Sequence, residues 1–185
     1  LPRYAEFAPL LRFDWQQLFL SMRYAQLLSD LPQVQNLPEQ DTYIPHSMHM
    51  LCNATLDLMC SPRFDLDELP VTRRATRVAQ RMGCIANTLT TWERELDSSD
   101  LSSGVFGYAF HRRILSHEEA RALPKAEVAA RIRAAHLERY FLLDFENLRA
   151  YLSSLRDECK SVDLGRFAAS LDELLMMHLS GKGLM

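Results

Sequence analysis

The sequence has little of several features that mark common protein classes. It contains only 6 glycines among 185 residues, and no stretch shows the clear apolar–polar alternation of a half-buried strand. Its four cysteines include no CxxC pair, which argues against a zinc site or a disulfide framework. No apolar run reaches the ~18 residues that a membrane helix needs. These absences predict an all-α protein without a membrane span.

The chain also has no large excess of basic or acidic residues. The chain has 21 basic and 24 acidic residues, so its formal net charge is -3. A nucleic-acid partner would call for a basic surface, and we expect none. The scattered cysteines are typical of reduced thiols, and no basic-then-apolar leader is visible. Both observations favour a cytoplasmic location.

The apolar pattern predicts helices separated by short breaks. Residues 30–41, "DLPQVQNLPEQD", are expected to form a proline-bearing loop. Ser116 is expected to be an N-cap, with Glu119 at the capping-box position. The charged helix after Pro124 is interpreted as an outer, solvated helix, with a homodimer interface as the alternative. The expected helices span residues 4–29, 43–59, 71–96, 105–114, 125–160 and 163–179.

The helix over residues 71–96 carries two different faces. At 100° per residue, Asn87, Thr91 and Glu95 lie in one line, about 150° from the apolar stripe. No charged residue occurs between Met82 and Trp92, whereas a solvated face would carry Lys, Glu and Arg. We therefore expect this part of the helix to be enclosed, with its polar line facing a cavity or a buried polar cluster. The apolar stripe consists of Val71, Ala75, Val78, Met82, Ile85, Leu89, Trp92 and Leu96.

The three polar side chains suit a divalent cation. An amide oxygen, a hydroxyl and a carboxylate are hard oxygen ligands, and Mg²⁺ combines such ligands with waters and substrate phosphates. One carboxylate leaves the ion with net positive charge, so phosphate oxygens would complete its coordination. Arg94, next to Glu95, could reach a phosphate oxygen from the same helix.

The stretch "NTLTTWERE" resembles the NSE metal motif of class I terpene synthases. In this sequence Asn87 is followed by Thr91 and Glu95 at steps of four, with Arg94 directly before the glutamate. The resemblance implies a helical bundle around an apolar cavity, with metals at its mouth. It also implies three Mg²⁺ ions that hold the diphosphate of an isoprenoid substrate, one of them bound by this segment.

The resemblance extends to three further segments. Residues 13–28 look like the helix before the family's pyrophosphate-sensing helix. Residues 41–59 look like the sensing helix itself, which is broken near its middle. Residues 98–120 are similar to the segment that follows the metal helix. The resemblance thus covers most of the 185 residues, loosely outside the motif.

The sequence departs from the family in three places. The Asp-rich DDxxD motif is absent, and the chain does not start with Met, so we expect residues 1–185 to be the C-terminal portion of a larger domain whose N-terminal part is missing. The sensing helix offers His46 or His49 where the family has an arginine. The C-terminal Arg-Tyr pair is not seen, and Lys182 is a substitute for it.

The resemblance implies an enzyme, a carbon–oxygen lyase. It would ionise and cyclise a C15 or C20 isoprenyl diphosphate and release diphosphate. Asn87, Thr91 and Glu95 would bind Mg²⁺, and the diphosphate oxygens would be held by Arg94, His46 and Lys182.

Other interpretations stay open. His46, His49 and His178 sit on apolar helices, which is typical of buried histidines with a structural role. One alternative function is a non-catalytic α-helical interaction or dimerisation domain, with Asn87, Thr91 and Glu95 in an internal hydrogen-bond network. Another is an isoprenoid chain-building or head-to-head synthase. Those enzymes use two Asp-rich motifs, so Asn87 speaks against that alternative.

Overall fold

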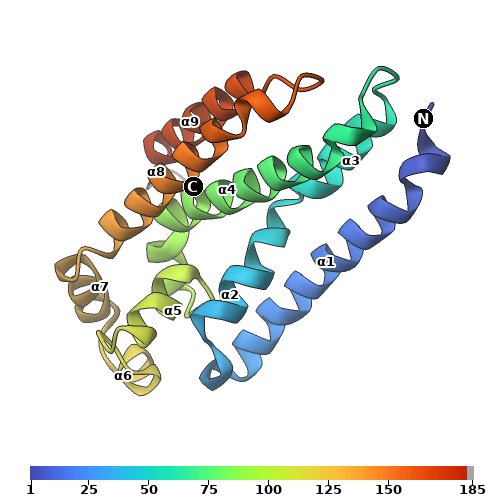
Figure 1. Cartoon of the computed structure of the whole chain (residues 1–185). Coiled ribbons are helices and arrows are strands. Elements are labelled where there is room, and N and C mark those ends of the chain that lie inside the picture. Colours follow the sequence, from blue (N-terminus) through green and yellow to red (C-terminus); the bar gives the residue numbers. More distant parts are fainter. Residues whose placement is uncertain (183–185) are drawn as a thin grey trace.

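The computed structural model describes residues 1–182, and within them the chain forms only helices, turns and loops (Figure 1). The all-α prediction is therefore confirmed. In this described part, no helix combines the length and apolar character needed to cross a membrane. The α-helices are α1 (Tyr4–Asp30), α2 (Leu37–Tyr43), α3 (Met50–Met59), α4 (Leu69–Asp97), α5 (Gly104–His111), α6 (His117–Ala122), α7 (Lys125–Ala134), α8 (Leu137–Ser154) and α9 (Leu164–Ser180). Short 3-10 helices are η1 (Pro32–Val34), η2 (Ile44–Met48), η3 (Leu66–Glu68) and η4 (Arg156–Glu158).

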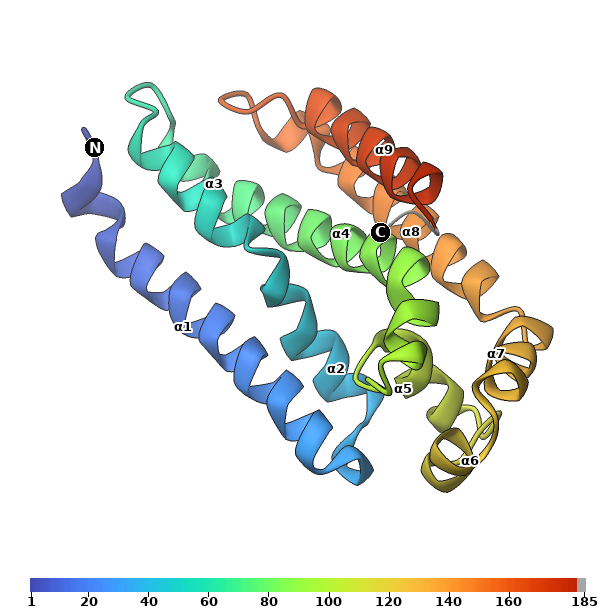
Figure 2. The ribbon, with the colours of Figure 1, turned by 180° about the vertical axis from the view of Figure 1, so that it is seen from behind.

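Helix α4 forms the centre of the molecule. Figures 1 and 2 show α8 and α9 on one side of it and α1 at the opposite edge, with α2 and α3 between. The predicted apolar stripe is confirmed: its residues are buried, except that Val78 is half-buried. The first part of the stripe packs against α8 and α9. Trp92, with none of its surface exposed, belongs to a second cluster with α5 and α7.

A buried ion pair fixes α1 to the rest of the fold. The Asp14 side chain has no exposed surface, and Arg73 of α4 donates to both of its carboxylate oxygens at 2.9 and 2.6 Å. Thr55 of α3 donates its hydroxyl to the same carboxylate at 2.6 Å. Three helices thus meet at one satisfied buried charge, which sets how α1 lies along α3 and α4.

Two predicted boundaries are wrong. Residues 30–41 were expected to form a loop, but α2 begins within them, because the Asn36 side chain accepts a hydrogen bond from Glu39 N at 3.0 Å and caps it. The helix expected over residues 43–59 is interrupted. There, η2 ends at Met48, His49 follows with a left-handed φ of 61°, and α3 starts at Met50. The chain is therefore broken near the middle of residues 41–59.

The long helix expected over residues 125–160 is also divided. His136, with φ of 53°, separates α7 from α8. Neither glycine nor proline marks this break, and a left-handed histidine gives no strong signal in a sequence. By contrast, Ser116 and Glu119 form the predicted capping box, and Asp163 caps α9.

Candidate functional site

The predicted polar line lies in an enclosed part of α4. Every residue from Met82 to Trp92 is buried or half-buried, which confirms that this uncharged segment is covered on all sides. Thr91 is buried, and Asn87 and Glu95 are half-buried.

Thr91 connects the members of this line. Its Oγ1 lies 2.7 Å from Glu95 Oε1 and 3.0 Å from the backbone oxygen of Asn87. The structure thus brings Thr91 and Glu95 into direct contact and joins them to Asn87 through the main chain. The Asn87 side chain is half-buried, and its amide forms no hydrogen bond with another described residue.

The Glu95 carboxylate is short of partners. Burial raises the pKa of this group, and the hydroxyl groups of Thr91 and Ser103 beside it offset only part of the effect. Its second oxygen, Oε2, is buried without a hydrogen-bond partner in the part of the chain that the structure describes. A buried carboxylate oxygen without a partner is costly unless a cation or donor reaches it. These oxygens therefore fit a divalent cation.

The polar line differs from a site built of many charged ligands. Among residues 1–182, no group of three or more His, Cys, Asp and Glu side chains is arranged to hold a metal ion. The polar line has one carboxylate (Glu95), one amide (Asn87) and one hydroxyl (Thr91), so it is not a cluster of charged or imidazole ligands. An ion bound there would need phosphate oxygens or waters to complete its coordination.

The other predicted ligand-binding residues lie apart from this line. Arg94 is on the same helix, and its side chain is exposed. Lys182 donates to Glu138 Oε1 at 2.6 Å, an oxygen that also accepts from Trp92 Nε1 at 2.9 Å. Since Trp92 belongs to the apolar stripe, Lys182 is bound on a different side of α4 from the polar line. His46 is buried in the pocket of arginines described below.

The remaining histidines differ from each other. His49 is exposed, so the interpretation of a buried histidine is wrong there, since the residue occupies the left-handed break before α3. His178 is half-buried, and its Nδ1 lies 3.4 Å from Thr90 Oγ1. That contact places the C-terminal end of α9 beside the part of α4 that carries the polar line.

An apolar pocket of about 350 Å³ lies on the side of α4 that carries Asn87, whereas Glu95 is about 100° around the helix and about 28 Å along it from Thr76 of the pocket. Helix α4 contributes Thr72 and Thr76 to it, and α3 and α9 flank it. Thr76 and Asn87 are eleven residues apart, which puts them about 20° apart around the helix and about 16 Å apart along it. The pocket is lined by Met50, Asn53, Ala54, Asp57, Leu58, Ser61, Thr72, Thr76, Val162, Leu164, Phe167 and Leu171.

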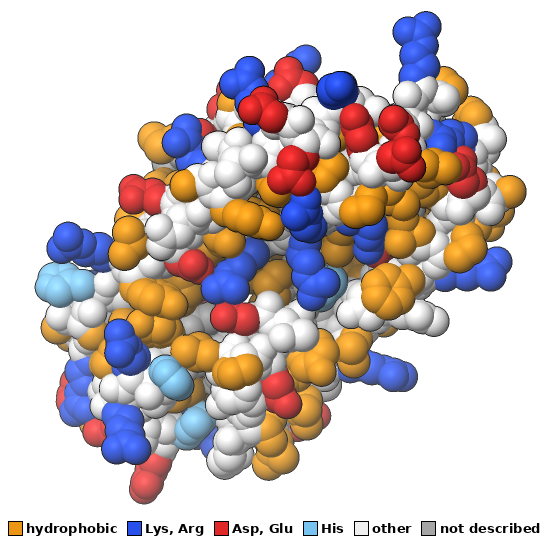
Figure 3. Space-filling model, viewed as in Figure 1, with side chains coloured by type: hydrophobic (Ala, Val, Ile, Leu, Met, Phe, Trp, Pro, Cys, Tyr) orange, Lys and Arg blue, Asp and Glu red, His pale blue; other side chains and the backbone are white. Residues whose placement is uncertain are grey.

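Sequence reasoning missed a second pocket, of about 280 Å³, between η2, α4 and α8. Arg74, Arg77 and Arg81 of α4 line it. Their spacing of three and four is a signal that places them on one side of a helix. Figure 3 shows basic side chains gathered near the middle of the face seen in Figure 1.

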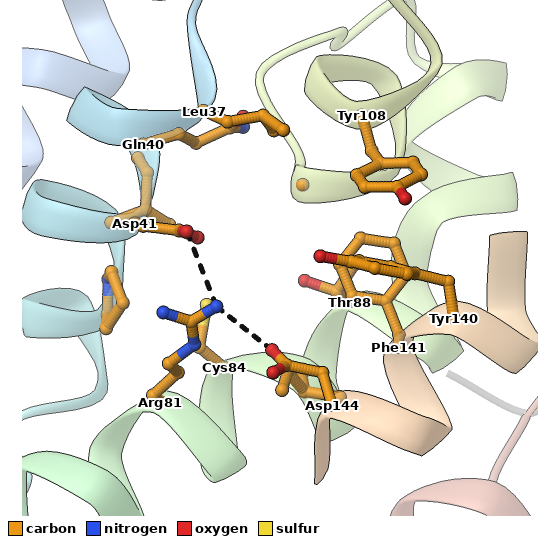
Figure 4. Close-up of a pocket in the computed structure, with 14 residues that line it drawn as sticks. Leu37, Gln40, Asp41, Arg81, Cys84, Thr88, Tyr108, Tyr140, Phe141 and Asp144 are labelled. Atoms are coloured by element: carbon orange, nitrogen blue, oxygen red, sulfur yellow. Dashed lines mark hydrogen bonds and ion pairs between the residues drawn. The ribbon is translucent and has the colours of Figure 1, made fainter. Parts of the chain in front are cut away.

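Arg81 also borders a smaller cavity of about 60 Å³ (Figure 4). Its guanidinium lies 3.0 Å from Asp144 and 3.4 Å from Asp41, so it joins α8 to α2. Opposite this ion pair, the rings of Tyr108 and Tyr140 stack with their centres 4.0 Å apart. The cavity is small and its charges are paired, so its role is structural.

Comparison of this chain with protein-family models, curated proteins and solved structures gives no match. The resemblance to class I terpene synthases therefore rests on the motif residues themselves.

Proposed function

We propose that this chain carries one metal-binding helix of a class I terpene synthase. The enzyme would ionise and cyclise a C15 or C20 isoprenyl diphosphate. The observation that carries the proposal is the pairing of Thr91 with Glu95 at 2.7 Å, with a buried, unpartnered carboxylate oxygen. An apolar pocket on the side of α4 that carries Asn87 supports it, because an isoprenyl chain needs a dry, hydrocarbon-lined space.

In this proposal each residue has a simple role. The Asn87 amide oxygen, the Thr91 hydroxyl and the Glu95 carboxylate hold one Mg²⁺ ion, which when bound supplies Lewis-acid stabilisation to the leaving diphosphate. Arg94 is exposed beside them and can bind a diphosphate oxygen. The apolar pocket orients the hydrocarbon chain and excludes water, so that the allylic cation formed by carbon–oxygen cleavage is not quenched early.

The test is product formation by the full-length protein. Farnesyl and geranylgeranyl diphosphate are incubated with it and Mg²⁺, and hydrocarbons are analysed by gas chromatography and mass spectrometry. Asn87→Ala and Glu95→Gln should each lower turnover ~100-fold or more, since even residues that only support metal ligands contribute 10–100-fold. Glu93→Gln is the matched control, because Glu93 pairs with Arg133 on another side of the helix.

Two results would contradict the proposal. The first is the absence of a hydrocarbon product with either substrate. The second is product formation that Asn87→Ala and Glu95→Gln leave at the level of the Glu93→Gln control. In the second case the enzyme would be a synthase whose metal site lies elsewhere.

The alternative of an interaction domain has one observation in its favour. Helix α1 exposes many large apolar side chains, more than scattered surface residues explain. Self-association through this face would be seen by analytical ultracentrifugation and lost in Phe19→Lys. A monomer at all concentrations would contradict it. The exposed side chains of α1 are Tyr4, Phe13, Trp15, Phe19, Leu20, Met22 and Leu27.

A further inference from the structure

The pocket of arginines lies in the first half of α4, several turns before the polar line. Arg74, Arg77 and Arg81 line it from α4, while η2 and α8 provide the other walls. Arg77 and Glu95 are eighteen residues apart, which is five turns and corresponds to about 27 Å along the helix. A ligand in this pocket would therefore not occupy the proposed metal site.

The pocket has one cation without a partner. Arg77 is exposed and forms no ion pair with any described residue. Arg81 uses only Nη2 in its ion pairs, so its Nε and Nη1 remain for another acceptor. Asp41 also lines the pocket, and its charge is held by Arg81. The ion pairs of the other two arginines are Arg81 with Asp144 and Asp41, and Arg74 with Glu158.

A buried amide adds an unpaired donor to the same pocket. Gln80 is only 1% exposed and lines the pocket. Its Oε1 accepts a hydrogen bond from Leu51 N at 3.3 Å, which fixes the orientation of the amide. Its Nε2 is buried and has no hydrogen-bond partner among the described residues. A buried donor left unpaired is unfavourable, so an acceptor in the pocket would be stabilised by it.

His46 completes the set of donors. It is 5% exposed and lines the pocket, and burial together with the charge of Arg77 lowers its pKa. A neutral imidazole has one N–H to donate, and it adds no charge. Val78 of α4 and Leu148 and Tyr151 of α8 also line the pocket. The pocket thus combines donors from η2 and α4 with apolar side chains.

We propose that this pocket binds the phosphate group of a small molecule, with Arg77, Gln80 Nε2 and His46 as its donors. A phosphate oxygen accepts charge-assisted hydrogen bonds from a guanidinium, which are stronger than neutral ones. The pocket volume of about 280 Å³ leaves room for more than the phosphate itself. The proposal does not depend on the proposed terpene synthase activity.

The test is calorimetric titration of the protein with orthophosphate and with pyrophosphate, in EDTA and at fixed low ionic strength. EDTA removes divalent cations, so binding through the Asn87 line is not measured. We expect saturable binding of at least one anion, weakened ~tenfold or more by Arg77→Gln, since hydrogen bonds to charged groups are the strong ones. Arg77→Lys should keep part of the affinity. Arg139→Gln is the matched control, because Arg139 is an exposed arginine of α8 that forms no ion pair with a described residue.

The proposal is overturned if neither anion binds saturably. It is also overturned if Arg139→Gln weakens binding as much as Arg77→Gln, because that result would mean diffuse surface attraction. Tighter binding of orthophosphate would indicate a monophosphate ligand, and tighter binding of pyrophosphate a diphosphate. Neither failure affects the hydrocarbon assay of Asn87→Ala and Glu95→Gln, so the two proposals fail separately.

Discussion

At the scale of single residues, Glu95 lies in surroundings that disfavour the ionised form of its carboxyl group. Burial raises its pKa above the ordinary value. A carboxyl whose pKa is raised on folding makes the protein less stable as pH rises from the ordinary pKa through the raised, folded pKa, because the unfolded chain ionises more easily. We therefore expect Glu95→Gln to make the metal-free protein more stable at neutral pH, and to abolish stabilisation by Mg²⁺ with pyrophosphate.

The measurement is the urea midpoint at pH 7, with and without Mg²⁺ and pyrophosphate, in the parent protein and in Glu95→Gln. Glu93→Gln again serves as control. If Glu95→Gln were less stable without metal, then the carboxylate would have a structural partner, and the interpretation of Glu95 as a metal ligand would lose its physical basis.

Asp14 is the opposite case, a buried charge whose partners are complete. Asp14→Ala would leave the hydrogen-bond donors of Arg73 and Thr55 without their acceptor. Removing one member of a buried ion pair costs ~3–5 kcal/mol, whereas an exposed pair is worth ~1 kcal/mol or less. Chemical denaturation should show this difference between Asp14→Ala and Asp172→Ala, whose partner Arg149 is exposed. Equal losses would mean that Asp14 is not buried in solution.

At the scale of elements, Glu68 joins the start of α4 to the segment before α9. Its two carboxylate oxygens accept hydrogen bonds from the backbone N–H groups of Lys160 and Ser161 at 2.8 and 2.7 Å. These bonds, with the one to Ser161 as the largest contribution, lower the pKa of Glu68 from 4.5 to about 2. Since these bonds favour the ionised carboxylate, its contribution to stability is present above pH 4.5 and lost as pH falls from 4.5 towards 2.

The prediction is checked by urea midpoints measured between pH 2 and 6. Glu68→Gln should flatten the acid-side loss of stability in that range. Asp67→Asn is the neighbouring control, because its carboxylate has no hydrogen bond in the part of the chain that the structure describes. An unchanged pH profile in Glu68→Gln would show that the carboxylate does not hold the two segments together.

The elements also show what a sequence can and cannot predict. The stripe from Val71 to Leu96 repeats at helical spacing, so the central helix and its buried face follow from periodicity alone. The breaks at His49 and His136 do not, because each depends on a left-handed backbone that neighbouring packing imposes on a non-glycine residue. Helix α2 was missed although Asn36 and Pro38 are ordinary start signals, since the prolines were interpreted as a loop.

The two candidate sites also differ in how far the sequence predicts them. Asn87, Thr91 and Glu95 belong to one helix, so their spacing placed them together before the structure was known. The phosphate pocket combines His46 of η2 with Gln80 and Arg77 of α4 and a wall from α8. Packing between residues far apart in the sequence creates this pocket. The spacing of residues within one helix does not predict which hydrogen-bond donors remain unpaired.

At the scale of the whole molecule, α4 separates the two proposed sites and supports both. Its apolar stripe packs against α8 and α9, its side that carries Asn87 also lines the apolar pocket, and its arginines face η2. Because nearly all of its middle is buried, opening this helix requires most of the fold to open. Helix α6 is the contrast, since it has six residues and only Ala120 is buried.

Native-state hydrogen exchange tests this arrangement. Backbone amides between Ala75 and Leu89 should exchange only through global unfolding, whereas those of α6 should exchange through local opening. We expect exchange of α6 to be faster by ~100-fold or more, because global unfolding of a domain costs ~5–15 kcal/mol. Urea should accelerate exchange strongly in α4 and weakly in α6. Equal rates in the two helices would mean that α4 opens independently of the rest of the fold. Such a helix could not hold Thr91 beside Glu95 at one end, nor Arg77 and Gln80 in the pocket nearer the other end.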